Sequence, residues 1–130
     1  MNEKKFKPPE EWMEQAEYDV GTAAAMLESG RYIYAVFMCH LSLEKALKAH
    51  FAKRLEENPP KIHNLNYLLE RSAVQLPTEY QNFVGELNDK SVPTRYPDVL
   101  KRILQDYKEE QTRRLLEKTK EIVGWLRTKL

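Results

Sequence analysis

The segment YIYAVFMCHLSLEKALKAHFAKRLEE, residues 32–57, decides the fold that we expect for this chain. It contains no proline or glycine, and its first twelve residues carry no charge. As an α-helix it would be roughly 40 Å long. Its apolar positions form two stripes, Ile33-Phe37-Leu41 and Val36-His40-Leu43-Leu47-Phe51. Together these stripes are wider than a helix at the edge of a bundle needs, so the helix is either central or shared with a second chain.

The remaining helices are predicted from the positions of the prolines. Leucine and alanine total 25 residues and valine and isoleucine total 11, which favours helix over strand. Proline is excluded from helix interiors, and Gly30 is a natural stop between two long helices. The predicted helices are residues 10–29, 32–57, 64–74, a fourth starting at Thr78, and 106–128. We expect an all-α, up-and-down antiparallel bundle of about five helices, with a tail at residues 1–9 and one domain at 10–130.

Three local signals refine these boundaries. Asn64 is a good N-cap for the third helix, and the spacing of Thr78 and Gln81 fits a capping box at the start of the fourth. Pro93 and Pro97 predict an extended connection over residues 89–98 before the last helix. Loops often carry function, so this connection is the first place to look for a site.

Composition excludes several classes of protein. The formal charge is +1, so no strong field indicates a nucleic-acid binder, although residues 101–130 are mildly basic. The single cysteine, Cys39, cannot form an intrachain disulfide, and with three scattered histidines it cannot form a zinc site. No apolar run approaches the roughly 20 residues that cross a bilayer, and no secretory signal is visible. We expect a cytoplasmic protein with no cofactor, no metal and no membrane association.

The second helix carries the first candidate site. His40, Glu44 and Lys48 are spaced four apart on one edge of that helix. Glu44, bordered by leucines, could be a general acid or base with a shifted pKa. The alternative is an ordinary surface pair between Glu44 and Lys48. Asp19 in the first helix is expected to cap, or to pair with a lysine across the hairpin.

The connection before the last helix carries the second candidate site. Arg95, Tyr96 and Asp98 are followed by Lys101 and Arg102. An arginine can clamp a phosphate, and a neighbouring tyrosine can stack on a base. The alternative is that Arg95 ties the loop to Glu44 or Asp19. In either case we expect Arg95 to face Glu44 or Lys48 at the middle of the second helix, because only there would it find a partner.

The other reactive residues favour structural roles. His63 is expected to satisfy backbone groups or to pack on a neighbour, with catalysis as the alternative. His50 is expected to lie at the solvated surface, and Cys39 to act as a small hydrophobe. The sequence contains no Gly-rich phosphate loop, metalloprotease histidine pair or serine nucleophile elbow.

Four elements in order make the chain similar to a known family. They are Trp12 with Ala16-Glu17-Tyr18-Asp19-Val20, Tyr34-Ala35-Val36-Phe37 leading into Glu44-Lys45-Ala46-Leu47-Lys48-Ala49, His63-Asn64-Leu65, and Arg95-Tyr96-Pro97. In this combination, over residues 10–129, the chain resembles the HEPN domain family.

The resemblance implies a dimeric helical bundle, similar to the helical domain of aminoglycoside nucleotidyltransferases. Such proteins are often encoded beside a small nucleotidyltransferase in prokaryotic toxin–antitoxin pairs. Many are metal-independent ribonucleases, marked by an arginine followed four to six residues later by a histidine near the last helix. Here no histidine follows Arg95 or Arg102.

Three functions are compatible with these features. The first is a non-catalytic homodimer that pairs with a nucleotidyltransferase and holds a nucleotide or RNA phosphate near Arg95, with Tyr96, Asp98, Arg102, Glu44 and Lys48 as candidate contacts. The second is a ribonuclease that uses Arg95 with Tyr96 or Asp98 in place of the missing histidine. The third is a purely structural bundle.

Overall fold

The computed structural model describes residues 6–130, and all regular structure in that range is α-helical. The helices are α1 (Pro9–Glu28), α2 (Tyr32–Leu55), α3 (Leu65–Ser72), α4 (Thr78–Arg95), α5 (Leu100–Asp106) and α6 (Glu109–Lys129). The all-α prediction is confirmed, and the predicted bundle lacked only the short α5. Residues 1–5 of the predicted tail lie outside the described residues.

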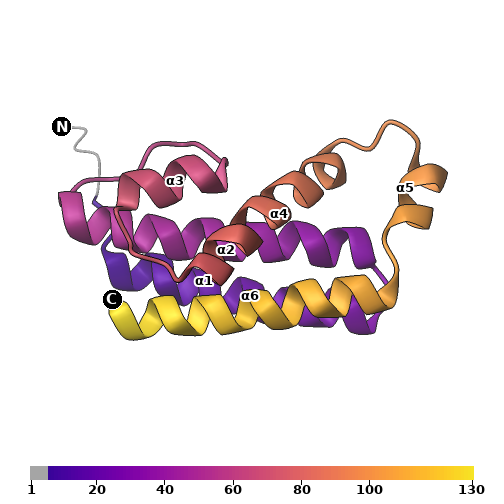
Figure 1. Cartoon of the computed structure of the whole chain (residues 1–130), viewed down its shortest axis with the longest axis horizontal. Coiled ribbons are helices and arrows are strands. Elements are labelled where there is room, and N and C mark those ends of the chain that lie inside the picture. The colour runs from indigo at the N-terminus through magenta and orange to yellow at the C-terminus, as the bar shows by residue number, and fades with distance from the viewer. Residues whose placement is uncertain (1–5) are drawn as a thin grey trace.

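Helices α1, α2 and α6 form the long body of the molecule (Figure 1). Proline at the first position starts α1, and Gly30, with φ of 77°, reverses the chain into α2. Helix α6 runs antiparallel to α1, and Arg127 near its end binds Glu17 in the first half of α1. Helices α2 and α6 run in the same direction because α3, α4 and α5 carry the chain back between them (Figure 1).

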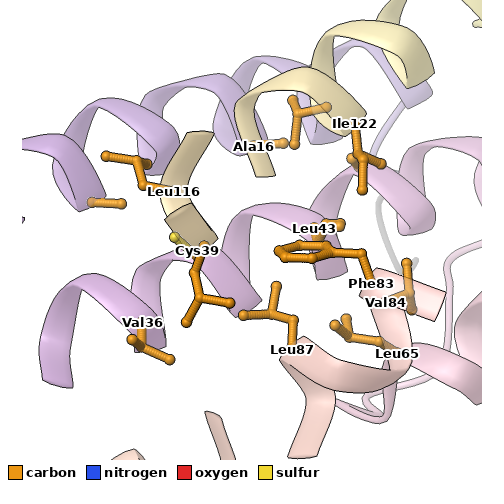
Figure 2. Packing of buried hydrophobic residues seen from close by; sticks show 14 of the residues in the cluster. Ala16, Val36, Cys39, Leu43, Leu65, Phe83, Val84, Leu87, Leu116 and Ile122 are labelled. Carbon is orange, nitrogen blue, oxygen red and sulfur yellow. The ribbon is translucent and has the colours of Figure 1, made fainter. Parts of the chain in front are cut away.

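Helix α2 is the central element and contacts all the other helices. Fifteen of its 24 residues are buried. Leu43 of α2 lies beside Phe83 of α4, and the sulfur of Cys39 points towards Leu116 of α6 (Figure 2). The width of the apolar surface of α2 is therefore explained within one chain, so a second chain is not needed to cover it.

The predicted caps have different outcomes. Asn64 caps α3 as expected, since its Oδ1 accepts a hydrogen bond from the Tyr67 backbone amide at 2.9 Å. The capping box at Thr78 is wrong, because the N-cap position is held by Pro77, which lacks a capping side chain. The Gln81 side chain instead donates to the Leu76 carbonyl at 2.8 Å.

The extended connection predicted for residues 89–98 is wrong over most of its length. Helix α4 continues through Pro93 to Arg95. Proline in a helix removes one backbone donor, here the one that would reach the Asp89 carbonyl, and side chains bind the two carbonyls that follow. The Thr94 hydroxyl donates to the Ser91 carbonyl, and the Tyr107 hydroxyl donates to the Lys90 carbonyl. Arg95, which was expected in a loop, is therefore the last residue of a helix.

The last predicted helix, residues 106–128, forms as α6, and the unpredicted α5 lies directly before it. Tyr107 and Lys108 are extended, so α5 ends at Asp106 and α6 begins at Glu109. Tyr107 is 8% exposed and its hydroxyl reaches α4, which fixes this break. Helix α5 stands away from the long body of the molecule (Figure 1). None of the helices in residues 6–130 is long and apolar enough to span a bilayer.

Candidate functional site

The candidate site is built around the carboxylate of Glu44, which is 3% exposed at the middle of α2. Lys48 Nζ donates to Glu44 Oε2 at 3.0 Å. His63 Nδ1 lies 3.0 Å from the same oxygen. Arg95 Nη2 lies 4.0 Å from Glu44 Oε1. We call Glu44, Lys48, His63 and Arg95 the Glu44 cluster.

Three separate segments bring the cluster together. Glu44 and Lys48 are one helical turn apart on α2. His63 lies in the connection that returns over α2, and this connection is held where Asn88 Oδ1 of α4 accepts the Leu65 backbone amide at 2.9 Å. Arg95 is the last residue of α4, and its guanidinium lies 5.2 Å from the centre of the Phe37 ring.

His40 lies one helical turn before Glu44 on α2 and supports the cluster. Its Nε2 is 2.7 Å from the His63 carbonyl, and its Nδ1 contacts the Ser91 hydroxyl. A carbonyl can only accept, so Nε2 carries the proton and Nδ1 accepts from Ser91. Burial lowers the pKa of His40 to about 4, and the nearby Arg95 charge acts in the same direction. His40 is therefore a neutral positioning residue that fixes the segment carrying His63.

The charges in the cluster do not cancel. Glu44 supplies one negative charge, and Lys48 and Arg95 each supply a positive one, which leaves a formal sum of +1 with a neutral His63. Arg95 Nη2 is buried and has no hydrogen-bond partner. A buried donor without a partner costs roughly 1–3 kcal/mol. An anion placed at Arg95 would satisfy both the donor and the excess charge.

The predicted approach of Arg95 to Glu44 is confirmed. The pair of Glu44 with Lys48 is also confirmed, but it is buried rather than at the surface. Asp19 pairs across the hairpin as expected, with Lys45 Nζ 2.8 Å from its Oδ2.

The remaining candidates lie elsewhere. Tyr96 is 89% exposed, and with Asp98 and Arg102 it lines a separate hollow of about 640 Å³ between the end of α4 and α5. Arg95 is not part of the lining of that hollow. Arg95 thus lies in the Glu44 cluster, whereas Tyr96, Asp98 and Arg102 lie at a separate hollow.

Two further reactive residues, His50 and Cys39, are buried. His50 is not at the solvated surface as predicted, because it is 8% exposed and its Nε2 donates to the Leu126 carbonyl at 2.8 Å. Cys39 is a buried hydrophobe as expected, and burial raises the pKa of its thiol to about 12. At neutral pH that thiol is protonated and unreactive.

His63 was not among the predicted site residues. Its Nδ1 contacts the Glu44 carboxylate, while 61% of its side chain is exposed. The available signal was Pro59-Pro60 directly after the long helix, because prolines there stop the helix and redirect the chain. In residues 6–130, no group of three or more His, Cys, Asp or Glu side chains could hold a metal ion.

We predict that His40 makes the protein less stable in mild acid. Its pKa is lowered from 6.5 to about 4, so between these values the unfolded chain binds a proton that the folded chain does not. Stability is therefore lost as the pH falls. From about pH 7 to about pH 5 the loss from this residue is about 2 kcal/mol. Urea unfolding at the two pH values measures it.

The control is His40→Gln, which can still donate to the His63 carbonyl and accept from Ser91. This variant is expected to be less stable at neutral pH but to lose less stability on acidification. Equal losses in the two proteins would show that the fold does not lower the pKa of His40.

Comparison with known proteins identifies related folds. The HEPN domain family model matches residues 9–129. TT1696 from Thermus thermophilus has a crystal structure with a TM-score of 0.81 and 25% identity, covering 94% of this chain and 98% of that one. ST0689, an archaeal HEPN homologue, has a TM-score of 0.76 and 26% identity, covering 95% and 98%. None of the curated proteins matches this chain significantly.

The family match begins at the first residue of α1 and ends at the last residue of α6. It therefore includes all six helices and all four residues of the Glu44 cluster. By this match over almost the whole sequence, the chain belongs to the HEPN domain family.

Proposed function

We propose that this chain is a cytoplasmic, dimeric helical module that pairs with a small nucleotidyltransferase in a toxin–antitoxin-like system. In this role it binds a phosphate group of a nucleotide or RNA at the Glu44 cluster and does not cleave it. The observation that carries the binding part of the proposal is the buried Nη2 of Arg95, which has no hydrogen-bond partner in a cluster of net positive charge.

The geometry of Arg95 supports an anion over a purely structural role. Its distance of 4.0 Å from Glu44 Oε1 is too long for a hydrogen bond, so Glu44 does not satisfy the guanidinium. The Arg95 side chain is 21% exposed although Nη2 itself is buried, so an anion from solvent would reach Nη2 after a shift of the side chain. Guanidinium groups bind phosphate through two parallel hydrogen bonds. A purely structural bundle would instead leave this donor without a partner.

The proposed dimer needs an apolar surface, and the end of α4 with α5 provides one. Val92, Tyr96, Val99, Leu100 and Leu104 are each about half exposed or more. Exposed apolar side chains gathered in one region are typical of protein interfaces. The pairing with a nucleotidyltransferase rests on family membership, since members of this family are often encoded beside such an enzyme.

Ribonuclease activity is the second candidate, and His63 is the observation that favours it. An ionised Glu44 accepts a hydrogen bond from His63 Nδ1, which leaves Nε2 as a proton acceptor on a largely exposed ring. A carboxylate that orients a histidine next to an arginine is an arrangement suited to acid–base chemistry on a phosphate. In this arrangement His63, and not Tyr96 or Asp98, would take the place of the missing histidine.

We predict that the protein binds short single-stranded RNA and that Arg95→Ala weakens binding about tenfold or more, because charge-assisted hydrogen bonds contribute roughly 1.5–3 kcal/mol. The matched control is Arg113→Ala, which removes an exposed arginine paired with Glu109 on α6. Arg102→Ala tests whether the hollow beside α5 takes part. Fluorescence anisotropy with labelled RNA gives the dissociation constants.

The same samples, incubated with RNA and resolved on a gel, test for cleavage. Intact RNA with the wild type supports binding without turnover. Cleavage that disappears in both Arg95→Ala and His63→Ala would establish the ribonuclease instead. Equal RNA affinity in the wild type and Arg95→Ala would contradict both candidates at this site.

We predict that the protein sediments as a dimer of 15.4 kDa chains. Leu104→Glu places a charge in the exposed surface of α5 and is expected to shift the protein towards monomer. Tyr18→Glu, at a residue of α1 that is 78% exposed, is the matched control and should leave the dimer intact. A wild-type monomer at micromolar concentrations would contradict the proposed dimer.

We predict that a nucleotidyltransferase gene adjoins the gene for this chain and that the two proteins co-purify. Co-expression with a tag on the nucleotidyltransferase, followed by size-exclusion chromatography, gives the result. Separate elution of the two proteins, or a gene neighbourhood without such an enzyme, would contradict the pairing. This outcome is independent of RNA binding by the isolated protein.

A further inference from the structure

A second hollow lies at the carboxyl end of α2, where the carboxyl ends of α2, α3 and α6 meet. Lys53 and Arg54 come from the last turns of α2, Ser72 from the end of α3, and Trp125 and Lys129 from the end of α6. The hollow has a volume of about 620 Å³. That volume is within the range of roughly 300–1,000 Å³ that small-molecule sites occupy. None of its lining residues belongs to the Glu44 cluster.

The hollow is positively charged. Lys53, Arg54 and Lys129 line it, and no aspartate or glutamate does. Among residues 6–130, none of these three cations has a carboxylate at ion-pair distance. Burial and the nearby Lys53 charge both lower the pKa of His50, which also lines the hollow. The histidine is therefore neutral at pH 7 and leaves the charge of the hollow to the three cations.

Helix α6 provides a comparison within the same element. Its other basic side chains all pair with carboxylates, namely Arg113, Arg114, Lys118, Lys120 and Arg127. Lys129 is the exception in that helix. Some cations elsewhere in residues 6–130, such as Lys101 and Arg102 of α5, also lack a carboxylate at ion-pair distance. The hollow differs in that three such cations from two helices line one space with no acidic side chain.

Helix dipoles explain part of this arrangement. Cations in the last turn of a helix are favoured by roughly 0.3–1 kcal/mol each. That effect accounts for a basic residue at each helix end, but it does not require the side chains of different helices to line one hollow. Lys53, Arg54 and Lys129 line the same space, and a bound anion would offset the like charges gathered there.

The hollow also has an aromatic wall. Trp125 is partly buried and packs edge-on against Tyr80, with ring centres 6.1 Å apart. Lys129 Nζ lies 5.3 Å from the centre of the indole ring. The contact with Tyr80 holds the indole in place, so a planar or apolar part of a ligand would meet a fixed surface beside the cations.

We propose that this basic hollow binds a small polyanion that carries two or more adjacent phosphate groups. Lys53, Arg54 and Lys129 hold the phosphates, and Trp125 contacts any ring attached to them. The site is separate from the Glu44 cluster and does not depend on the function proposed for that cluster.

Isothermal titration calorimetry of the full chain with sodium tripolyphosphate tests the proposal. We expect saturable binding to the wild type, weakened about tenfold or more in the double variant Lys53→Ala/Lys129→Ala. The matched control is Lys120→Ala, an exposed lysine of α6 paired with Glu117. It should bind as the wild type does, and so should Arg95→Ala, which separates this site from the Glu44 cluster.

A second arm identifies the source of the phosphates. If the ligand carries a ring, a nucleoside triphosphate binds more tightly than tripolyphosphate and changes the fluorescence of Trp125, and Trp125→Phe removes the change. If the ligand is inorganic, the two probes bind alike. Either result supports a polyanion site. The absence of saturable binding, or equal weakening by Lys120→Ala and the double variant, would overturn the proposal.

Discussion

The buried charge of Glu44 is the constraint on which the rest of the structure depends. A carboxylate in a protein interior costs several kcal/mol unless cations and hydrogen-bond donors surround it. One neighbour, Lys48, is supplied by α2 itself. The others come from the segment before α3 and from the end of α4. Both of these segments must therefore lie against the middle of α2, and the short connection after α2 and the length of α4 meet that requirement.

The helices were largely predictable because proline and glycine determine where a helix stops. Two of the errors, the helix that continues through Pro93 and the unpredicted α5, lie where the Tyr107 hydroxyl joins the segment before α6 to α4. Proline at position 93 removes a backbone donor, but Thr94 and Tyr107 bind nearby carbonyls and the helix continues. The break at Tyr107 arises because its side chain is anchored to α4. Neither contact can be inferred from the spacing of apolar residues.

The candidate site was predictable only in part. The proximity of Arg95 and Glu44 followed from the cost of burying an unpaired charge. His63 was missed because the sequence does not show which side of α2 the following connection crosses. Tyr96 and Arg102 were grouped with Arg95 because they are neighbours in sequence. The end of α4 separates them, since the chain leaves the helix at Tyr96 and turns towards α5.

The antiparallel contact of α1 with α6 has a consequence for how the chain folds during synthesis. The ribosome completes α1 and α2 first, and they can form a hairpin at once because the contacts between them are local. Helix α6 is the last of the six to be made, yet it covers parts of both helices. Until then the side of α2 that faces α6, where Cys39 lies, is exposed to solvent on the nascent chain. Emergence of α6 from the ribosome is therefore the step that closes the core, and a chain stalled before it would expose an aggregation-prone surface.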